Sequence, residues 1–88
     1  MFDVRLSNSV VKFLNRANPN LRKRVKAAYK ILTENPVPAS DYDLVKLSGS
    51  ENKYRIRLSS YRLIYSVLWD EKVINILEIE RRGETTYK

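Results

Sequence analysis

The sequence predicts an α+β domain in which two helices pack on one face of a small twisted sheet, and three observations carry this prediction. Between residues 8 and 34, apolar side chains recur at spacings of three and four, which is typical of amphipathic helices. From residue 53 onward they alternate with polar side chains, which is typical of strands. The two patterns come in separate blocks, an order that favours helices gathered on one side of an antiparallel sheet.

Length and composition indicate a single globular domain. The 88 residues suffice for one hydrophobic core, and 43% hydrophobic residues with two Gly and three Pro exclude a low-complexity chain. No apolar stretch approaches the ~18 residues of a membrane helix, and the first residues lack the pattern of a signal peptide. The absence of cysteine fits a reducing compartment. We therefore expect one domain over residues 1–88, in the cytoplasm and without a membrane partner.

The first predicted elements are a strand and two helices. Alternating apolar residues predict the strand over residues 2–6, and either Ser7 or Asn8 is a suitable N-cap for a helix that extends to residue 17. Asn18 and Pro19 then begin a second helix, which ends before Pro36 and is followed by an extended connection to about residue 43. Its outer face is cationic and is formed by Arg22, Lys23, Lys26 and Lys30.

Three consecutive strands follow and form an antiparallel meander. The alternation predicts strands over residues 53–58 and 61–68, joined at Ser59 and Ser60. A turn at Asp70 and Glu71 leads to a third strand over residues 73–79, which carries apolar side chains on both faces, as an interior strand requires. The aromatic residues expected in the core are Phe13, Tyr54, Tyr61 and Tyr65.

The first hairpin predicts an unusual contact. If Ser59 and Ser60 form a two-residue loop, the directly opposed pairs are Leu58 with Tyr61, Arg57 with Arg62, Arg55 with Ile64 and Lys53 with Ser66. Opposed like charges destabilise a sheet by roughly 0.2–1 kcal/mol, whereas an arginine fork matches phosphate oxygens well. The pattern therefore favours an anion-binding face. The alternative is a solvated face, with the arginines spread apart or paired with Glu78 or Glu80.

The charge balance also limits the chemistry. With 17 Lys and Arg against 10 Asp and Glu, the net charge is +7, so a polyanion is the natural partner. The chain contains no histidine and no cysteine, which excludes nucleophilic triads of the Ser-His and Cys-His types. A metal site would have to be built from carboxylates, and we expect neither a metal site nor a cofactor.

Four short motifs lie in the second half of the chain: KLSG at residues 46–49, YRIRL at 54–58, YRLIY at 61–65 and ERRGETTYK at 80–88. With these motifs and its order of elements, nearly the whole chain resembles the RelE family of toxin–antitoxin toxins. Proteins of this fold include ribosome-dependent mRNA endonucleases and ParE relatives that poison DNA gyrase. The resemblance therefore implies the fold more specifically than the activity.

The activity implied by the resemblance is metal-independent cleavage of mRNA in the ribosomal A site. The RNA supplies the nucleophile, because its 2′-hydroxyl attacks the adjacent phosphorus. By position, the resemblance places Arg55, Arg57, Arg62, Arg81 and Tyr87 in the catalytic site. Arg57 and Arg62 would contact the phosphate, Arg81 would protonate the leaving oxygen, and Tyr87 would stack on a base or orient the hydroxyl. Either Arg81 or the adjacent Arg82 could enter the site. The residues expected to bind RNA outside it are Lys53, Arg82, Arg22, Lys23, Lys26 and Lys30.

The sequence leaves the proton acceptor open. Family members often carry lysine at the positions of Arg55 and Arg57, and arginine does not lose its proton near neutral pH. The catalyst could depend mainly on electrostatics and positioning, or it could use another acceptor. The candidates are Lys53, Tyr87, Glu78, Glu80 and Glu84.

The resemblance also implies partners. A cognate RelB-like antitoxin, acidic and partly disordered when free, would neutralise the toxin, and the ribosome with its mRNA would be the target. We expect the free toxin to be a monomer and its antitoxin complex to be a larger oligomer. Two other functions remain compatible with the sequence: a ParE-like gyrase inhibitor, and a non-catalytic RNA-binding module that uses the cationic helix.

Overall fold

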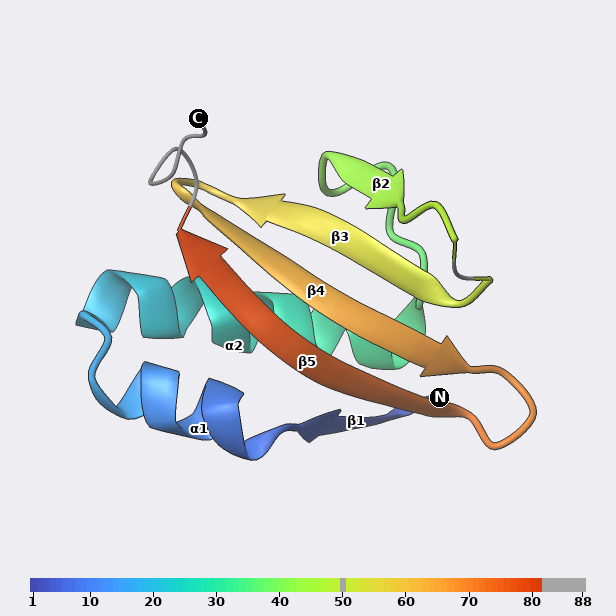
Figure 1. Ribbon diagram of the computed structural model, residues 1–88, viewed down its shortest axis with the longest axis horizontal. Helices are drawn as coiled ribbons and strands as arrows, with labels where there is room; N and C mark the ends of the chain where they lie inside the picture. The colour runs from blue at the N-terminus through green and yellow to red at the C-terminus, as the bar shows by residue number, and fades with distance from the viewer. Residues whose placement is uncertain (50, 82–88) are drawn as a thin grey trace.

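The computed structural model describes residues 1–49 and 51–81. It shows two helices and a five-stranded sheet along the described chain (Figure 1). In order, the elements are β1 (Asp3–Leu6), α1 (Asn8–Asn15), α2 (Pro19–Glu34), β2 (Leu44–Lys46), β3 (Lys53–Leu58), β4 (Tyr61–Leu68) and β5 (Val73–Arg81).

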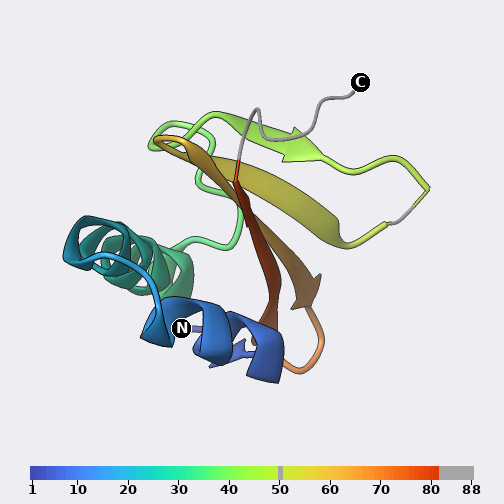
Figure 2. The same ribbon diagram turned by 60° about the vertical axis from the view of Figure 1, so that its left-hand side comes forward.

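The sheet has the strand order β1-β5-β4-β3-β2. β1 runs parallel to β5, and every other neighbouring pair is antiparallel. Figure 2 shows both helices on the same side of the twisted sheet. The predicted α+β class and the strand-helix-helix-strand order are therefore confirmed. No helix in the described part of the chain is long and apolar enough to cross a membrane.

Capping residues set the starts of the two helices. The Ser7 hydroxyl accepts a hydrogen bond from the Val10 amide at 3.2 Å, which selects Ser7 over Asn8 as the cap of α1. Asn18 caps α2 in the same way, with its side-chain oxygen 2.9 Å from the Leu21 nitrogen. Pro19 occupies the first turn, where its missing N–H costs nothing.

The core lies between the helices and the covered face of the sheet. α2 contributes a fully buried stripe that includes Ala28 and Leu32, and the strands contribute alternate residues such as Leu63 and Tyr65. Because both helices occupy one face, no helix from residues 1–49 and 51–81 lies over the opposite face of β2, β3 and β4. Functional side chains on that face are therefore accessible.

The β3–β4 hairpin has the register predicted from its two-residue loop. Arg57 lies opposite Arg62, and Leu58 lies opposite Tyr61. Ser59 adopts a φ of 59°, a left-handed conformation that a two-residue hairpin loop commonly requires. This register directs Arg57 and Arg62 to the face without helices.

The structure corrects the prediction between residues 36 and 53. We expected an extended connection and three strands in the second half, but Leu44–Lys46 forms an additional strand, β2. Val45 pairs with Arg55, and β2 thereby becomes the edge of the sheet beside β3. Its three residues are too few to show a periodicity, so only pairing with β3 reveals the strand.

The last strand, β5, is longer than predicted and contains a β-bulge. It extends to Arg81 instead of residue 79. Ile64 pairs with Glu78 and Tyr65 with Ile76, so Leu77 is the extra residue on β5. The Ser7 hydroxyl donates a hydrogen bond to the Leu77 carbonyl at 3.0 Å, which joins the bulge to the start of α1.

Candidate functional site

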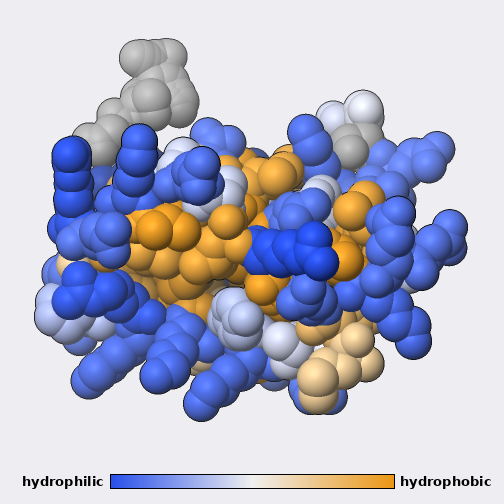
Figure 3. All heavy atoms as spheres, turned by 90° about the horizontal axis from the view of Figure 1, so that it is seen from below, coloured by the Kyte–Doolittle hydropathy of each residue, from blue (hydrophilic) through white to orange (hydrophobic). Residues whose placement is uncertain are grey.

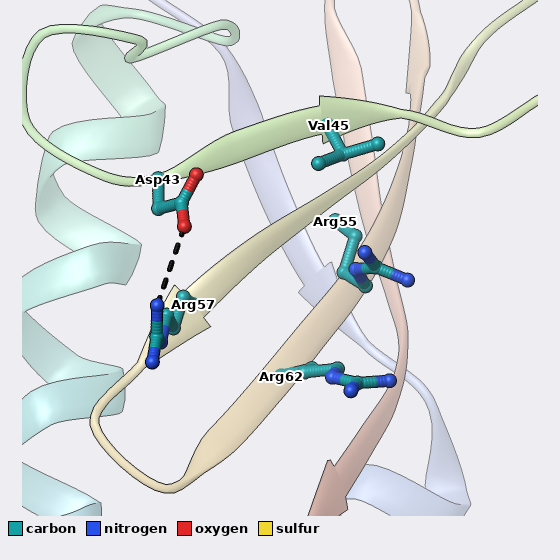
Figure 4. Close-up of a pocket in the computed structure, with 5 residues that line it drawn as sticks. All are labelled: Asp43, Val45, Arg55, Arg57 and Arg62. Atoms are coloured by element: carbon teal, nitrogen blue, oxygen red, sulfur yellow. Dashed lines mark hydrogen bonds and ion pairs between the residues drawn. The ribbon is translucent and has the colours of Figure 1, made fainter. Parts of the chain in front are cut away.

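A hollow of about 110 Å³ lies on the uncovered face of the sheet. Three neighbouring strands and the residue before β2 build its walls. Figure 4 shows its lining residues, which are Asp43, Val45, Arg55, Arg57 and Arg62. The three arginines that the resemblance placed in the catalytic site are therefore brought together.

The strand pairing explains this convergence. Arg55 and Arg57 are two residues apart on β3 and so project to the same face, while Arg62 on β4 lies directly opposite Arg57. Val45 lies opposite Arg55 on β2 and supplies the apolar part of the wall. The hollow is therefore fixed by backbone register in the centre of three strands, which is a rigid platform for an anion.

The opposed arginines turn away from each other (Figure 4). Arg57 points toward Asp43, with 3.5 Å between Nη1 and the carboxylate oxygen, whereas Arg55 and Arg62 extend in a common direction. Within residues 1–49 and 51–81, neither Arg55 nor Arg62 forms an ion pair. Glu80 on β5 lies opposite Arg62 in the strand register but forms no ion pair with it, and Glu78 lies opposite Ile64. The two half-buried guanidinium groups therefore remain available to a ligand.

Asp43 is a residue of the hollow that the sequence analysis missed. Its carboxylate is the one acidic group among the lining residues, and its side chain is 68% exposed. The Asp43 carbonyl also accepts a hydrogen bond from the Arg57 amide at 3.1 Å, so the backbone holds this residue beside β3. No signal in the sequence points to it, because Asp43 is placed by β2, a strand that is revealed only by its pairing with β3.

Arg81 is not brought to the hollow. It pairs with Tyr61, whose side chain lies on the helix-covered face, and its guanidinium carbon lies 6.0 Å from the centre of the Tyr61 ring. The predicted position at the leaving oxygen is therefore not supported for Arg81. The other two predicted tail residues, Arg82 and Tyr87, lie outside the described residues.

The remaining predicted RNA-binding residues occupy two other places. Lys53 shares the open face with Arg55 but lies at the far end of β3, opposite Ser66. Arg22 donates hydrogen bonds to the Ala17 and Leu14 carbonyls at 2.6 and 3.4 Å, and thus supports the end of α1. The other predicted RNA-binding residues of α2, which are Lys23, Lys26 and Lys30, are exposed.

The tyrosines expected in the core do pack there. The Tyr54 and Tyr65 rings stack with centroids 5.7 Å apart, and Tyr61 meets Phe13 edge-on at 6.0 Å. The Tyr65 hydroxyl donates a 2.7 Å hydrogen bond to the Pro36 carbonyl. Burial, with a smaller contribution from Tyr54, raises the Tyr65 pKa far above its usual range, so this group stays protonated and has a structural role.

Comparison with known proteins identifies the family of this fold and site. The family model described as "ParE toxin of type II toxin-antitoxin system, parDE" matches residues 4–86. A protein of Methanocaldococcus jannaschii named "Putative toxin RelE1" is 38% identical over 87 residues, which are 99% of this chain and 96% of that protein.

Solved structures agree with this result. The archaeal RelE–RelB complex from Pyrococcus horikoshii OT3 contains a chain that is 38% identical, with a TM-score of 0.87 over 96% of this chain and 98% of that one. The isolated RelE toxin of E. coli has the same fold, with a TM-score of 0.78 at 21% identity over 97% of this chain and 88% of that one. The chain therefore belongs to the RelE/ParE family of toxins from type II toxin–antitoxin systems.

Proposed function

We propose that this toxin is a ribosome-dependent endoribonuclease that cleaves mRNA in the ribosomal A site. The observation that carries the proposal is the convergence of Arg55, Arg57 and Arg62 in one hollow on the open face of the sheet. Two of these cations have no carboxylate partner among the described residues. Such an arrangement suits a reaction whose transition state accumulates negative charge on phosphate oxygens.

The proposed reaction is an internal transesterification. The 2′-oxygen of the RNA forms a bond to the adjacent phosphorus, and the bond from phosphorus to the 5′-oxygen breaks. The products are a 2′,3′-cyclic phosphate and a free 5′-hydroxyl. One proton leaves the 2′-hydroxyl and one reaches the 5′-oxygen, so the reaction needs no oxidant, no added nucleophile and no metal-bound water. The three arginines stabilise the phosphorane between these two states.

We assign the proton acceptor of this reaction to Asp43. It is the one carboxylate that lines the hollow, and it lies beside Arg57, which would orient it by the 3.5 Å contact. Lys53, Glu78 and Glu80 do not line the hollow. For proton donation to the 5′-oxygen, the candidates are now Arg82 and Tyr87, because Arg81 lies on the other face of the sheet.

The second part of the proposal is neutralisation by an acidic, RelB-like antitoxin. Relatives from Pyrococcus horikoshii and Methanococcus jannaschii form RelE–RelB complexes. On the underside of this molecule, Figure 3 shows an apolar area bordered by hydrophilic side chains. A groove of about 310 Å³ between β1, α1 and α2 is lined by Leu6, Leu14, Val25 and Tyr29 and by two cations, Arg22 and Lys26. An acidic segment of the antitoxin would fit this groove, because its apolar side chains would contact the apolar lining and its carboxylates would face Arg22 and Lys26.

Cleavage of mRNA on purified ribosomes tests the nuclease. We expect new 5′-ends within the A-site codon, and about a 100-fold slower reaction for each of Arg55→Ala, Arg57→Ala and Arg62→Ala, because each removes one charged donor from the transition state. Asp43→Asn should bind programmed ribosomes as well as the parent protein and cleave far more slowly. Arg5→Ala is the matched control, since Arg5 is exposed on β1 and its one ion pair among the described residues is with Asp3.

The same protein should be tested against DNA gyrase, because the matching family model is described by the ParE name. If the protein leaves mRNA intact under conditions in which an active RelE toxin cleaves it, and if it inhibits DNA supercoiling by gyrase, the nuclease proposal is wrong and the ParE activity is correct. Binding of RNA with neither effect would leave the RNA-binding module.

A further inference from the structure

A second hollow lies on the helix-covered side of the sheet, at the tip of the β3–β4 hairpin. It has a volume of about 260 Å³ and is formed where the start of α2, the hairpin loop and the end of β5 meet. Figure 1 shows these three segments at the same end of the molecule. The lining residues that carry the argument are Asn20, Arg24, Ser59, Ser60, Tyr61 and Arg81.

The chemistry of this hollow is that of an anion site. Arg24 and Arg81 contribute two cations, and the serine hydroxyls and the Asn20 amide contribute neutral donors. No carboxylate lies among its described lining residues, and neither arginine forms an ion pair within the described chain. The hollow also contains Asn18, the N-cap of α2, so the positive end of that helix is directed to the same place.

Arg81 is held in position for such a ligand. Its guanidinium group lies over the Tyr61 ring at 6.0 Å, and that ring packs edge-on against Phe13. The cation–π contact limits the motion of a long side chain before any ligand arrives. A cation fixed in this way loses less conformational entropy on binding a phosphate than a free surface lysine would.

The second hollow is joined to the arginine hollow by a third one. This intermediate hollow, of about 320 Å³, is lined by Arg24, Tyr42, Arg57 and Ser59, among others, and by one carboxylate, that of Asp41. It shares Arg57 with the arginine hollow, and it shares Arg24 and Ser59 with the second hollow. A continuous series of hollows therefore leads from Arg62 past Arg57 and around the hairpin to Arg24 and Arg81. Cations outnumber the two acidic lining residues, Asp43 and Asp41, along it.

We propose that the phosphodiester backbone of RNA follows this path. One phosphate would lie in the arginine hollow, and a second phosphate would bind between Arg24 and Arg81. The inference rests on the proposed function for its first phosphate and adds a second contact site to it. The RNA could be the mRNA strand itself or a segment of ribosomal RNA, which present the same phosphate chemistry. Arg81 then acts as a binding residue instead of a proton donor.

Direct binding measurements test the proposal without relying on cleavage. Two probes are titrated over a series of salt concentrations. The first is a single-stranded RNA oligonucleotide with a 2′-deoxy nucleotide at the cleavage site, which lacks the attacking 2′-hydroxyl and is not cut. The second is the vacant ribosome. The variants are Arg24→Gln, Arg81→Gln and their double variant. Arg81→Lys keeps the charge, and Arg16→Gln removes an exposed arginine of the α1 C-cap that lines none of these hollows.

We expect each Gln variant to bind about 3–10 fold more weakly at moderate salt. The double variant should lose about 0.7 from the slope of log Kd against log salt, the value for one phosphate of a single strand. Arg81→Lys should restore most of the affinity, and Arg16→Gln should bind like the parent. Loss with the oligonucleotides assigns the site to the mRNA strand, and loss with ribosomes alone assigns it to ribosomal RNA. Unchanged affinity and slope for both probes would overturn the proposal.

These outcomes are separable from the fate of the nuclease. If the parent protein cleaves mRNA and the variants bind normally, the second site is wrong and the nuclease stands. If the parent protein cleaves nothing while the variants lose affinity, the second site stands and the nuclease is wrong. Matching thermal unfolding curves for Arg24→Gln and the parent protein check that the exposed substitution leaves the fold intact.

Discussion

Two arginine side chains set the balance between stability and function at the residue scale. Arg57 and Arg62 are directly opposed across β3 and β4, where like charges normally repel. The turn of Arg57 toward Asp43 relieves part of the repulsion, but that ion pair is exposed and contributes little. The opposition of Arg57 and Arg62 therefore does not stabilise the fold, whereas a phosphate bound between the two arginines would favour it.

A double-mutant cycle measures this repulsion. For Arg57→Gln, Arg62→Gln and the double variant, we expect a coupling free energy of about 0.5 kcal/mol, because removing either cation relieves the same unfavourable contact. The measurement is the free energy of unfolding by urea at low salt, repeated at 0.5 M salt, where the coupling should shrink. Inorganic phosphate should stabilise the parent protein more than the double variant. Strictly additive effects at low salt would show that the two side chains do not interact.

At the scale of elements, β4 joins the sheet to the segment that leaves α2. Tyr65 is fully buried on β4, and its hydroxyl donates to the Pro36 carbonyl at 2.7 Å. That contact holds the connection leading to Asp43 and β2. The position of one wall of the arginine hollow therefore depends on a hydrogen bond from the core.

Tyr65→Phe tests this link. At pH 7 the variant should lose about 1–2 kcal/mol of unfolding free energy, because the carbonyl of Pro36 is left without its donor. Burial raises the Tyr65 pKa, so above about pH 10 the unfolded chain releases this proton while the folded chain keeps it. Stability of the parent protein should therefore fall as the pH rises past this value, and the variant should lose that part of the decline.

The control for this experiment is Tyr29→Phe, which removes a hydroxyl from a tyrosine that is 38% exposed. Its urea denaturation curves at pH 7 should match those of the parent protein. A Tyr65→Phe variant as stable as the parent protein at pH 7, with the same alkaline decline, would contradict a structural role for the hydroxyl.

The same scale shows which parts of the fold and site the sequence could predict. Local signals sufficed for the helices, whose caps are Ser7 and Asn18, and for the β3–β4 register, which follows from a two-residue loop. The arginine cluster could be predicted because it depends only on that register. β2 could not, since three residues carry no period and the strand exists through its pairing with β3.

Two features of the site were hidden for related reasons. Asp43 reaches the hollow because β2 is placed beside β3, a contact between segments that no local pattern encodes. The face of Arg81 depends on the bulge at Leu77, which shifts the alternation along β5 by one residue. In an interior strand that is apolar on both faces, the sequence does not show where such a shift occurs.

At the scale of the whole molecule, the net charge of +7 is nearly constant between pH 6 and 8. The sequence has no histidine or cysteine, so no side chain in it normally titrates between pH 6 and 8. A cationic surface of this kind attracts polyanions, and its charges also repel one another in the compact state. The free toxin therefore carries an electrostatic cost that an anionic partner removes.

The thermal stability of the free protein should report this cost. Raising the salt from about 10 mM to 0.5 M shortens the screening length from ~30 Å to a few ångströms, and we expect the midpoint of thermal unfolding to rise by about 5 °C, equivalent to roughly 1 kcal/mol for a domain of this size. Between pH 6 and 8 at fixed salt, the midpoint should stay nearly constant. A midpoint that falls with salt would mean that favourable ion pairs outweigh the repulsion, although within the described chain only Arg5–Asp3 and Arg57–Asp43 are paired, both of them exposed.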